Sequence, residues 1–341
     1  MSTLIISSIL IISLLLTFIV KEIVLKLKIL DTPNKRSSHS QPTPTLGGVA
    51  IILSFMLGIT LMFYAKTIPN ELFLPFVLGG GLLGLISFFD DIKPIAIKYR
   101  ISLHIIIAFL TVYWLDIHLF SDWLSYHIGL SYLSIGVSAF ILLLGINTVN
   151  FMDGIDGIVA TQIIFVFTVI TLFLINDNNI VDARYFALLV AISLGFLVFN
   201  FAPAQIFMGD VGSIFLGFII SVLLIYTVNT NSISFSVWLI LLAMFWLDVV
   251  FVLIVRILNK DNITHAHKTH FYQKLTQYFS LKNSRTYAHR KTIYSITAIN
   301  ILWLLPLATI AEYYPEYSVI SLVISLIPLL FLMWKFKAGK V

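Results

Sequence analysis

The stretch Asn147-Thr-Val-Asn-Phe-Met-Asp-Gly-Ile-Asp-Gly157 follows an apolar run from Tyr132 to Ile146. Two amides and two carboxylates recur in it at intervals of three residues: Asn147, Asn150, Asp153 and Asp156. On a helix this spacing turns the four side chains towards one slowly rotating face. Each carboxylate is followed by a glycine, so no side chain keeps a ligand from the backbone there. A helix that merely ends in water does not need this pattern, and we interpret the stretch as part of a functional site.

The composition of the chain is that of a membrane protein. Of 341 residues, 59% are hydrophobic and 11% are charged, whereas soluble domains are about 45–50% apolar and about 25% charged. The mean hydropathy of +1.01 excludes a soluble globular protein. The net charge of +5 comes from loops, so it does not indicate nucleic-acid binding. The absence of cysteine excludes thiolate metal sites and leaves oxygen and imidazole ligands, which favour a hard cation such as Mg²⁺.

Apolar runs of roughly 20 residues predict membrane-spanning helices. We expect eleven such helices, or ten if one run is re-entrant. They cover about residues 3–20, 46–65, 72–89, 101–117, 132–149, 156–175, 184–203, 212–229, 235–256, 293–311 and 318–334. We do not expect the first to be a cleavable signal peptide, because no basic residue precedes it and no small-residue cleavage site follows it.

The basic residues predict the orientation of these spans. Lys21, Lys26 and Lys28 follow the first span, which places the N-terminus outside. The cytoplasmic segments are then about 21–45, 90–100, 150–155, 204–211 and 256–292, with the segment after 334. They contain 19 of the 21 Lys and Arg residues, in agreement with the positive-inside rule. We therefore predict an all-α polytopic membrane protein, a single domain over residues 1–341, with its chemical clusters on the cytoplasmic side.

Two of these cytoplasmic segments carry acidic clusters. Asp90 and Asp91 are adjacent, and they form either a metal–phosphate platform or a surface cluster balanced by nearby basic residues. Asp210 stands between two glycines at the start of a new helix, as a cation ligand or as an N-cap. Phe207, three residues earlier, either stacks on a base or lies in the membrane interface.

Two other cytoplasmic segments carry cationic and imidazole side chains. In the first loop, Arg36 can contact phosphate oxygens, although the loop can equally be an ordinary basic turn region. The longest loop contains His265, His267, Lys268 and His270. Their spacing is not that of a metalloprotease helix, and it suits a pyrophosphate better, with a solvated basic loop as the alternative.

Several polar residues lie apart from these clusters. A buried carboxylate such as Asp248, in the ninth predicted span, costs on the order of 3 kcal/mol, so we expect it to face the bundle. Arg256 lies about 12 Å further along that helix and is not an obvious partner. The run Gly79–Gly81 indicates a packing contact or a hinge in the third span. We interpret four isolated histidines as structural: His104, His118, His127 and His289.

Five motifs in chain order carry a resemblance to a known family. They are Asp31-x-Pro-Asn-x-Arg, Phe-Asp-Asp91, Asn-x-x-Asn-Phe-Met-Asp-Gly-x-Asp-Gly157, Phe-Met-Gly-Asp-x-Gly-Ser213 and the histidine-containing loop. The series resembles the polyprenyl-phosphate N-acetylhexosamine-1-phosphate transferases of glycosyltransferase family 4. Arg36-Ser-Ser-His39, Pro42-Thr-Pro-Thr45 and Ala266–Gln273 look most like the branch that initiates O-antigen synthesis. The separated histidines argue against the phospho-MurNAc-pentapeptide translocase branch, which stays the alternative.

The resemblance implies an enzyme and its partners. The reaction would transfer N-acetylhexosamine 1-phosphate from a UDP-sugar to undecaprenyl phosphate and release UMP, with Mg²⁺ as cofactor and Mn²⁺ as its substitute. It would start lipopolysaccharide (O-antigen) or other cell-wall polysaccharide synthesis at the bacterial plasma (inner) membrane. The bilayer and both substrates are the expected partners, nucleic acid is not, and a homodimer is left open. The phosphate monoester has a second pKa near ~6, so a general base is optional.

The resemblance also implies roles for individual residues. The expected catalytic residues are Asp90, Asp91, Asp153, His267 and His270. The expected metal ligands are Asp210 and Asp91, with Asp90 and Asp91 ambiguous between base and ligand. The expected substrate-binding residues are Asn150, Asp156, Asn200, Phe207, Lys268, His265 and Arg36.

A transporter or lipid flippase is the alternative from a different class. Such proteins place polar groups near the middle of the bilayer, on interrupted helices of repeated halves. In this chain the polar clusters fall on one membrane face and no internal repeat is visible. The sequence therefore favours a transferase.

Overall fold

A computed structural model describes residues 2–33, 42–115, 132–262 and 267–340, with six single positions between 119 and 130. Over these ranges the chain is helical apart from two antiparallel strands of two residues each and short turns. The first half contains α1 (Ser2–Leu27), β1 (Leu30–Asp31), β2 (Thr43–Pro44), α2 (Gly48–Tyr64), α3 (Asn70–Leu74), a π-helical turn (Pro75–Gly80), α4 (Gly81–Ile92), α5 (Ile97–Leu115) and α7 (Leu133–Met152). The second half contains α8 (Ile158–Asn176), α9 (Ile180–Asn200), α10 (Gly209–Asn229), α11 (Phe235–Leu241), α12 (Ala243–Leu258), α13 (Phe271–Ser280), α14 (Arg285–Ile299), a π-helical turn (Asn300–Leu304), α15 (Leu305–Tyr313), a 3₁₀ turn (Pro315–Tyr317) and α16 (Ser318–Lys335).

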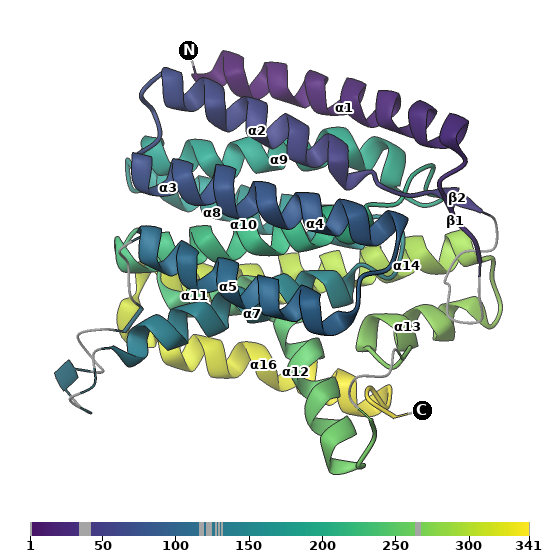
Figure 1. Ribbon diagram of the computed structural model, residues 1–341. Helices are drawn as coiled ribbons and strands as arrows, with labels where there is room; N and C mark the ends of the chain where they lie inside the picture. Colours follow the sequence, from purple (N-terminus) through teal and green to yellow (C-terminus); the bar gives the residue numbers. More distant parts are fainter. Residues whose placement is uncertain are drawn as a thin grey trace.

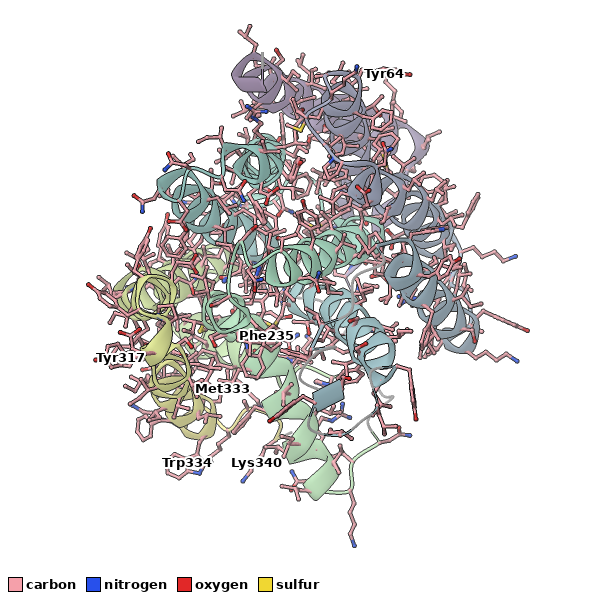
Figure 2. The ribbon with its side chains drawn as sticks, turned by 90° about the vertical axis from the view of Figure 1, so that its left-hand side faces the viewer. Tyr64, Phe235, Tyr317, Met333, Trp334 and Lys340 are labelled. Carbon is pink, nitrogen blue, oxygen red and sulfur yellow. The ribbon has the colours of Figure 1, made fainter. Side chains whose placement is uncertain are left out.

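Most long helices lie side by side along one direction, as Figure 1 shows and as the end-on view of Figure 2 confirms. Within the described residues, nine helices are long and apolar enough to cross a membrane. The pair α11 and α12, bent by 79°, is a tenth candidate, and α2 is a shorter apolar helix of 17 residues. Each of the eleven apolar runs is therefore largely helical over its described residues, and the polytopic fold is confirmed. The count of eleven and the orientation stay predictions, because α2 is short and the ninth run is bent.

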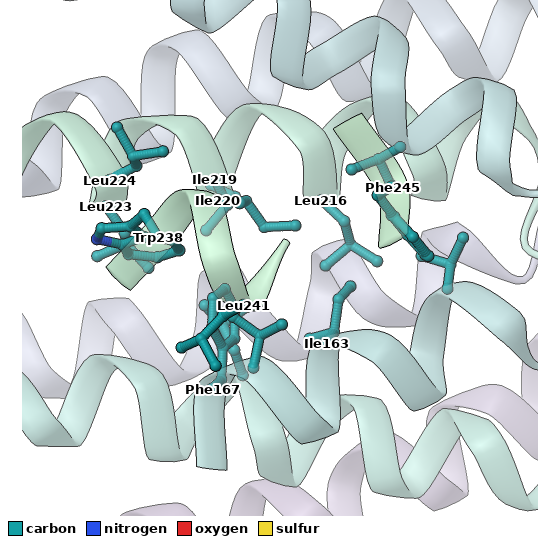
Figure 3. Packing of buried hydrophobic residues seen from close by; sticks show 14 of the residues in the cluster. Ile163, Phe167, Leu216, Ile219, Ile220, Leu223, Leu224, Trp238, Leu241 and Phe245 are labelled. Atoms are coloured by element: carbon teal, nitrogen blue, oxygen red, sulfur yellow. The ribbon is translucent and has the colours of Figure 1, made fainter. Parts of the chain in front are cut away.

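Helix α10 is the centre of the bundle. Every residue from Val211 to Ile225 is buried, although a surface helix would expose one face. It packs against α2, α4 and α7. Figure 3 shows its apolar side chains meeting Trp238 and Leu241 of α11 and Phe167 of α8. Because α10 begins at Gly209, this packing fixes the position of Asp210 at one end of the bundle.

The run Gly79–Gly81 is a packing contact. Its first two glycines end the π-helical turn, where the backbone approaches α10 closely. A Cβ atom on Gly79 would lie 2.6 Å from Cζ of Phe218, closer than real contacts allow. The third span therefore bulges at a point where its glycines leave room for the rings of Phe218 and Phe215 of α10.

The bend between α11 and α12 leaves backbone carbonyls without helical partners, and polar side chains donate hydrogen bonds to these carbonyls instead. The indole Nε1 of Trp246 donates to the carbonyl of Leu239 at 2.8 Å. The amide Nε2 of Gln162, from α8, donates to the carbonyl of Leu241 at 3.0 Å. Asn300 orients that amide, because its Nδ2 donates to Oε1 of Gln162 at 2.7 Å. The bend is thus braced inside the bundle, and α12 leaves the common helix direction (Figure 1).

Candidate active site

The polar ends of several helices meet around one cavity of about 1130 Å³, here called the acidic cavity. It lies at the end of the bundle where β1, β2 and α13 are drawn in Figure 1. Its carboxylates are Asp31, Asp90, Asp91, Asp153, Asp156 and Asp210. Its basic side chains are Lys28, Arg100, Lys268 and Arg285. The expected convergence of separate clusters at one end of the bundle is therefore present.

The turn between α7 and α8 presents Asp153 and Asp156. Helix α7 ends at Met152, so the helical face predicted for four polar residues holds only Asn147 and Asn150. The four polar residues therefore do not share one helical face, whereas the break predicted at about 150–155 is present, because Gly154 and Gly157 favour a turn over a continued helix. Gly157 takes φ +75° and its N–H donates to Oδ1 of Asn200 at 3.0 Å, which joins the turn to the end of α9.

Asp91 is held at the N-terminus of α10. Its two carboxylate oxygens accept the backbone N–H groups of Asp210 and Val211, each at 3.1 Å. A helix N-terminus stabilises a negative charge placed there. Gly209 takes φ +73°, and a Cβ atom on it would lie 2.5 Å from Oδ2 of Asp91. Glycine at 209 is therefore required for this contact between α4 and α10.

Asp210 is positioned by two other side chains. Nδ2 of Asn150 donates to its Oδ1 at 2.9 Å, and Nη2 of Arg100 donates to its Oδ2 at 2.7 Å. Arg100 also pairs with Asp90, whose Oδ1 accepts the backbone N–H of Ile95 at 2.6 Å. Asp90 is thus engaged in holding the turn after α4. Asp91, Asp153 and Asp210 lie close enough together in the cavity for their charges to act on one another.

The chemistry of these three side chains, rather than a preformed geometry, suits a hard divalent cation. Burial, and next the charges of Asp210, Asp91 and Asp156, together raise the pKa of Asp153 to about 8. Carboxylate and amide oxygens are ligands that Mg²⁺ prefers. In the described part of the chain, no three His, Asp or Glu side chains are already arranged around a common metal position. A cation here would therefore use one or two carboxylates, together with water and substrate phosphate, as Mg²⁺ commonly does.

Asp156 contacts the turn after α9 and helix α14. Its Oδ2 accepts the backbone N–H of Ala204 at 3.0 Å, and its Oδ1 lies 3.3 Å from Nδ1 of His289. His289 lines the acidic cavity, which the interpretation of this histidine as an isolated structural residue did not anticipate. Asn200 is buried and its Nδ2 donates to the carbonyl of Ile206 at 2.9 Å. Asn200 therefore braces two turns of the cavity wall.

The loop from His267 to His270, here called the histidine loop, is anchored by Asp248. That carboxylate is fully buried and accepts the backbone N–H of Phe271 at 2.8 Å and of Tyr272 at 3.3 Å. Nδ1 of His270 lies 3.4 Å from the same carboxylate. Asp248 thus faces the bundle, as expected, and caps the N-terminus of α13.

The lysine and the histidines of this loop differ in their relation to the acidic cavity. Lys268 lines the acidic cavity, whereas His267 and His270 are not among the lining residues. Oγ1 of Thr269 lies 2.9 Å from Nδ1 of His267. Burial, and next the charges of His270 and Arg256, lower the pKa of His267 to about 4, so this ring is neutral near pH 7.

Eight predicted site residues line the acidic cavity: Asp90, Asp91, Asp153, Asp156, Asn200, Phe207, Asp210 and Lys268. Asn150 lies behind Asp210, and His267 and His270 lie beside Lys268. Arg36 and His265 are outside the described residues. The individual roles stay predictions. Sequence reasoning missed Arg285 and the bridging role of Arg100, for which the only signal was a basic residue near an acidic cluster.

Comparison with known proteins agrees with this geometry. The family model described as Glycosyl transferase family 4 matches residues 73–228, which include Asp90, Asp91, Asp153 and Asp210. The chain belongs to glycosyl transferase family 4. The matched region covers α4 to α10, and so contains the helices that hold the three grouped carboxylates.

Two kinds of relative are similar to this family member. The probable undecaprenyl-phosphate N-acetylglucosaminyl 1-phosphate transferase of Bacillus subtilis is 28% identical over 267 residues, covering 77% of this chain and 74% of the relative. The phospho-N-acetylmuramoyl-pentapeptide-transferase of the same species is 34% identical, covering 54% of this chain and 60% of the relative. That of Latilactobacillus sakei is 30% identical, covering 55% and 62%. The chain therefore spans less than two thirds of these two pentapeptide transferases.

Proposed function

We propose that this family member is a polyprenyl-phosphate sugar-1-phosphate transferase that takes its sugar from a UDP-N-acetylhexosamine. The observation that carries the proposal is the acidic cavity, where Asp91, Asp153 and Asp210 meet beside basic side chains. Phosphoryl transfer needs this combination, because the protein mainly positions the reactants and neutralises charge. Both kinds of relative are named as transferases, one of them for undecaprenyl phosphate.

The chemistry is a displacement at phosphorus. An oxygen of the lipid phosphate forms a bond to the phosphorus that carries the sugar, and the bond from that phosphorus to the UMP oxygen breaks. A phosphate monoester with a second pKa near ~6 is largely ionised at pH 7, so no residue has to remove a proton first. Bound Mg²⁺ would neutralise the diphosphate and stabilise the leaving UMP.

The acidic residues of the cavity would have separate roles in binding and positioning. Asp210 and Asp91 would hold the cation, with Asn150 and Arg100 keeping Asp210 in place. Asp90 serves to hold Arg100 rather than to act as a base.

The basic groups at the cavity wall would contact the outer phosphate oxygens, since lysine and arginine both bind phosphate. Those groups are Lys28, Lys268 and Arg285. Phe207 lies in the cavity wall, where a nucleobase can stack on its ring.

The sugar and the pathway are finer proposals. We favour an N-acetylhexosamine such as N-acetylglucosamine, because the Bacillus subtilis relative that matches over 267 residues is named for it. We further propose that the product starts an O-antigen-type polysaccharide at the bacterial inner membrane, on the motifs Arg36–His39 and Ala266–Gln273. The separated histidines disfavour a muramyl-pentapeptide substrate, and the gathering of polar groups at one end of the bundle disfavours a flippase.

The test supplies purified protein with undecaprenyl phosphate and Mg²⁺, and compares UDP-N-acetylglucosamine, other UDP-N-acetylhexosamines and UDP-MurNAc-pentapeptide. UMP release and the mass of the lipid product are measured. We expect UMP only when lipid and nucleotide sugar are both present, with a lipid-diphosphate-sugar as product. Turnover with UDP-MurNAc-pentapeptide and with none of the other nucleotide sugars would assign the chain to the translocase branch. No UMP with any sugar would reject the transferase.

A further inference from the structure

The residues after α16 fold back onto the histidine loop. The backbone N–H of Gly339 donates to the carbonyl of Thr269 at 2.8 Å. The ring of Phe336 meets the rings of Phe271 and Tyr278 edge to face, at centroid distances of 5.6 and 5.7 Å. Residues 336–340, here called the C-terminal segment, therefore contact both the loop that carries Lys268 and the helix that follows it.

The same segment packs against α12. Ala338 is buried, and Gly339 takes φ +79° with its Cα close to the helix. A Cβ atom on Gly339 would lie 2.7 Å from Cβ of Val255. The position of the C-terminal segment is therefore coupled to α12 and to the histidine loop at once.

A second cavity of about 260 Å³, here called the tail cavity, lies between α12 and the C-terminal segment. Its wall is largely apolar, and its basic residues are Lys337 and Lys340. Lys335 and Lys260 are exposed and adjoin lining residues in the sequence. Among the described residues, the ion pairs include none of these four lysines, and the neighbouring Asp261 faces Arg256 instead. The tail cavity thus combines an apolar wall with an unbalanced positive rim.

The surroundings place this cavity at a lipid surface. Trp334 is 69% exposed and Leu258 is 75% exposed, which a water-facing surface would rarely show for two adjacent apolar groups. Figure 2 shows Trp334 and Lys340 together at one edge of the bundle. Tryptophan favours the membrane–water interface, where lysines beside it meet lipid phosphates.

We propose that the tail cavity binds an anionic phospholipid, with the phosphate beside Lys337 and Lys340 and acyl carbons along Phe251 and Val255. The bound lipid neutralises the rim and holds the C-terminal segment on α12. Through Gly339 and Phe336 it stabilises the histidine loop. This site is separate from the acidic cavity and does not depend on the proposed reaction.

The experiment adds dioleoyl-phosphatidylglycerol, dioleoyl-phosphatidylcholine or inorganic phosphate to the full-length protein in neutral detergent. Thermal unfolding and hydrogen exchange of the amides of residues 269–275 are measured. We compare the native chain with Lys337→Gln/Lys340→Gln, with the charge-preserving Lys337→Arg/Lys340→Arg, and with the control Lys93→Gln/Lys98→Gln, whose lysines lie at the end of α4 and in the first turn of α5. Each lysine near an anionic lipid contributes roughly fivefold in affinity, so the double Gln variant should bind about 25-fold more weakly.

We expect phosphatidylglycerol alone to raise the unfolding temperature and slow exchange in the histidine loop. The Arg variant and the control variant should keep both effects, and the double Gln variant should lose both. Equal effects of phosphatidylcholine, or an unchanged response of the double Gln variant, would overturn the site. A full effect of inorganic phosphate would replace the lipid by a free anion. Binding without slower loop exchange would overturn the coupling. None of these readouts requires catalysis.

Discussion

Replacing Asp248 by asparagine tests whether this buried carboxylate positions the histidine loop. The side chain is fully buried and accepts two backbone N–H groups of α13, at 2.8 and 3.3 Å, with His270 beside it at 3.4 Å. Asparagine has nearly the same shape, but it keeps one acceptor and turns an NH₂ group towards a donor.

The size of the effect follows from these contacts. A hydrogen bond to a charged group contributes about 1.5–3 kcal/mol, and a buried donor left without an acceptor costs about 1–3 kcal/mol. We expect a loss of about 2–4 kcal/mol, most of it as local opening of the loop. If the reaction requires the closed loop, that loss corresponds to a decrease in turnover of up to about 30- to 1000-fold.

The assay measures hydrogen exchange of residues 267–276 and UMP release by the same preparation. The matched control is Asp182→Asn, since Asp182 is a buried carboxylate that accepts from Asn179 and Ser232 at the opposite end of the bundle. The control should lower overall stability without faster exchange in the histidine loop. Unchanged exchange and turnover in Asp248→Asn, or equal loop exchange in both variants, would refute the positioning role.

Three further predictions concern the acidic cavity. A cation held by Asp210 and Asp91 favours ionised carboxylates beside it, and the pKa values of Asp91 and Asp153 are raised to about 7 and about 8, so calorimetric affinity for Mn²⁺ should rise as the pH increases from 6 to 8, and Asp153→Asn should reduce this slope. Metal-free protein should lose stability as the pH rises from about 4 to about 8, because the folded state keeps a proton that the unfolded chain releases. Gly209→Ala should displace Asp91 and lower turnover at least about tenfold, since its Cβ would clash at φ +73°, whereas Gly136→Ala, which meets nothing within 4 Å, should be neutral.

Each of these has a contradicting result. Cation affinity that does not change with pH would mean that Asp153 is already ionised without the cation. Stability that increases with pH over the same range would show that burial does not raise the pKa of this group. Full activity of Gly209→Ala would show that the contact between Asp91 and the start of α10 is dispensable.

Hydropathy predicted the apolar helices, and the order of the spans predicted which clusters meet. Hydropathy did not predict α13 and the first half of α14, which lie in the segment 256–292 that was expected to be a loop, because both helices carry many polar residues. Asp91, Asp153 and Asp210 each stand at a helix end, and two predicted spans separate each of them from the next, so these ends fall on the same side of the bundle. Such an argument needs no side-chain detail, because a spanning segment must emerge on the other face. The grouping of carboxylates could therefore be inferred from the sequence.

Contacts between distant segments could not be inferred in this way. A loop separates Asp248 from the backbone amides of α13. Hydrophobic periodicity says nothing about the path of this loop, so the sequence did not predict which groups Asp248 contacts. The suggestion that Asp153 and Asp156 share a helical face with Asn150 extended the helix too far, because polar residues spaced three apart occur in turns as well as on helices. The 79° bend at Leu242 has no proline or glycine to signal it, and depends on Gln162 from another helix.

The most direct measurement of the central claim is UMP release by Asp210→Asn and Asp91→Asn at saturating Mg²⁺, with folding checked by thermal unfolding. Asp177→Asn, an exposed carboxylate at the far end of α8, is the control. The account predicts that both cavity variants lose lipid-dependent UMP release while Asp177→Asn keeps it. Full activity in a folded Asp210→Asn variant would contradict the assignment of the acidic cavity as the reaction centre.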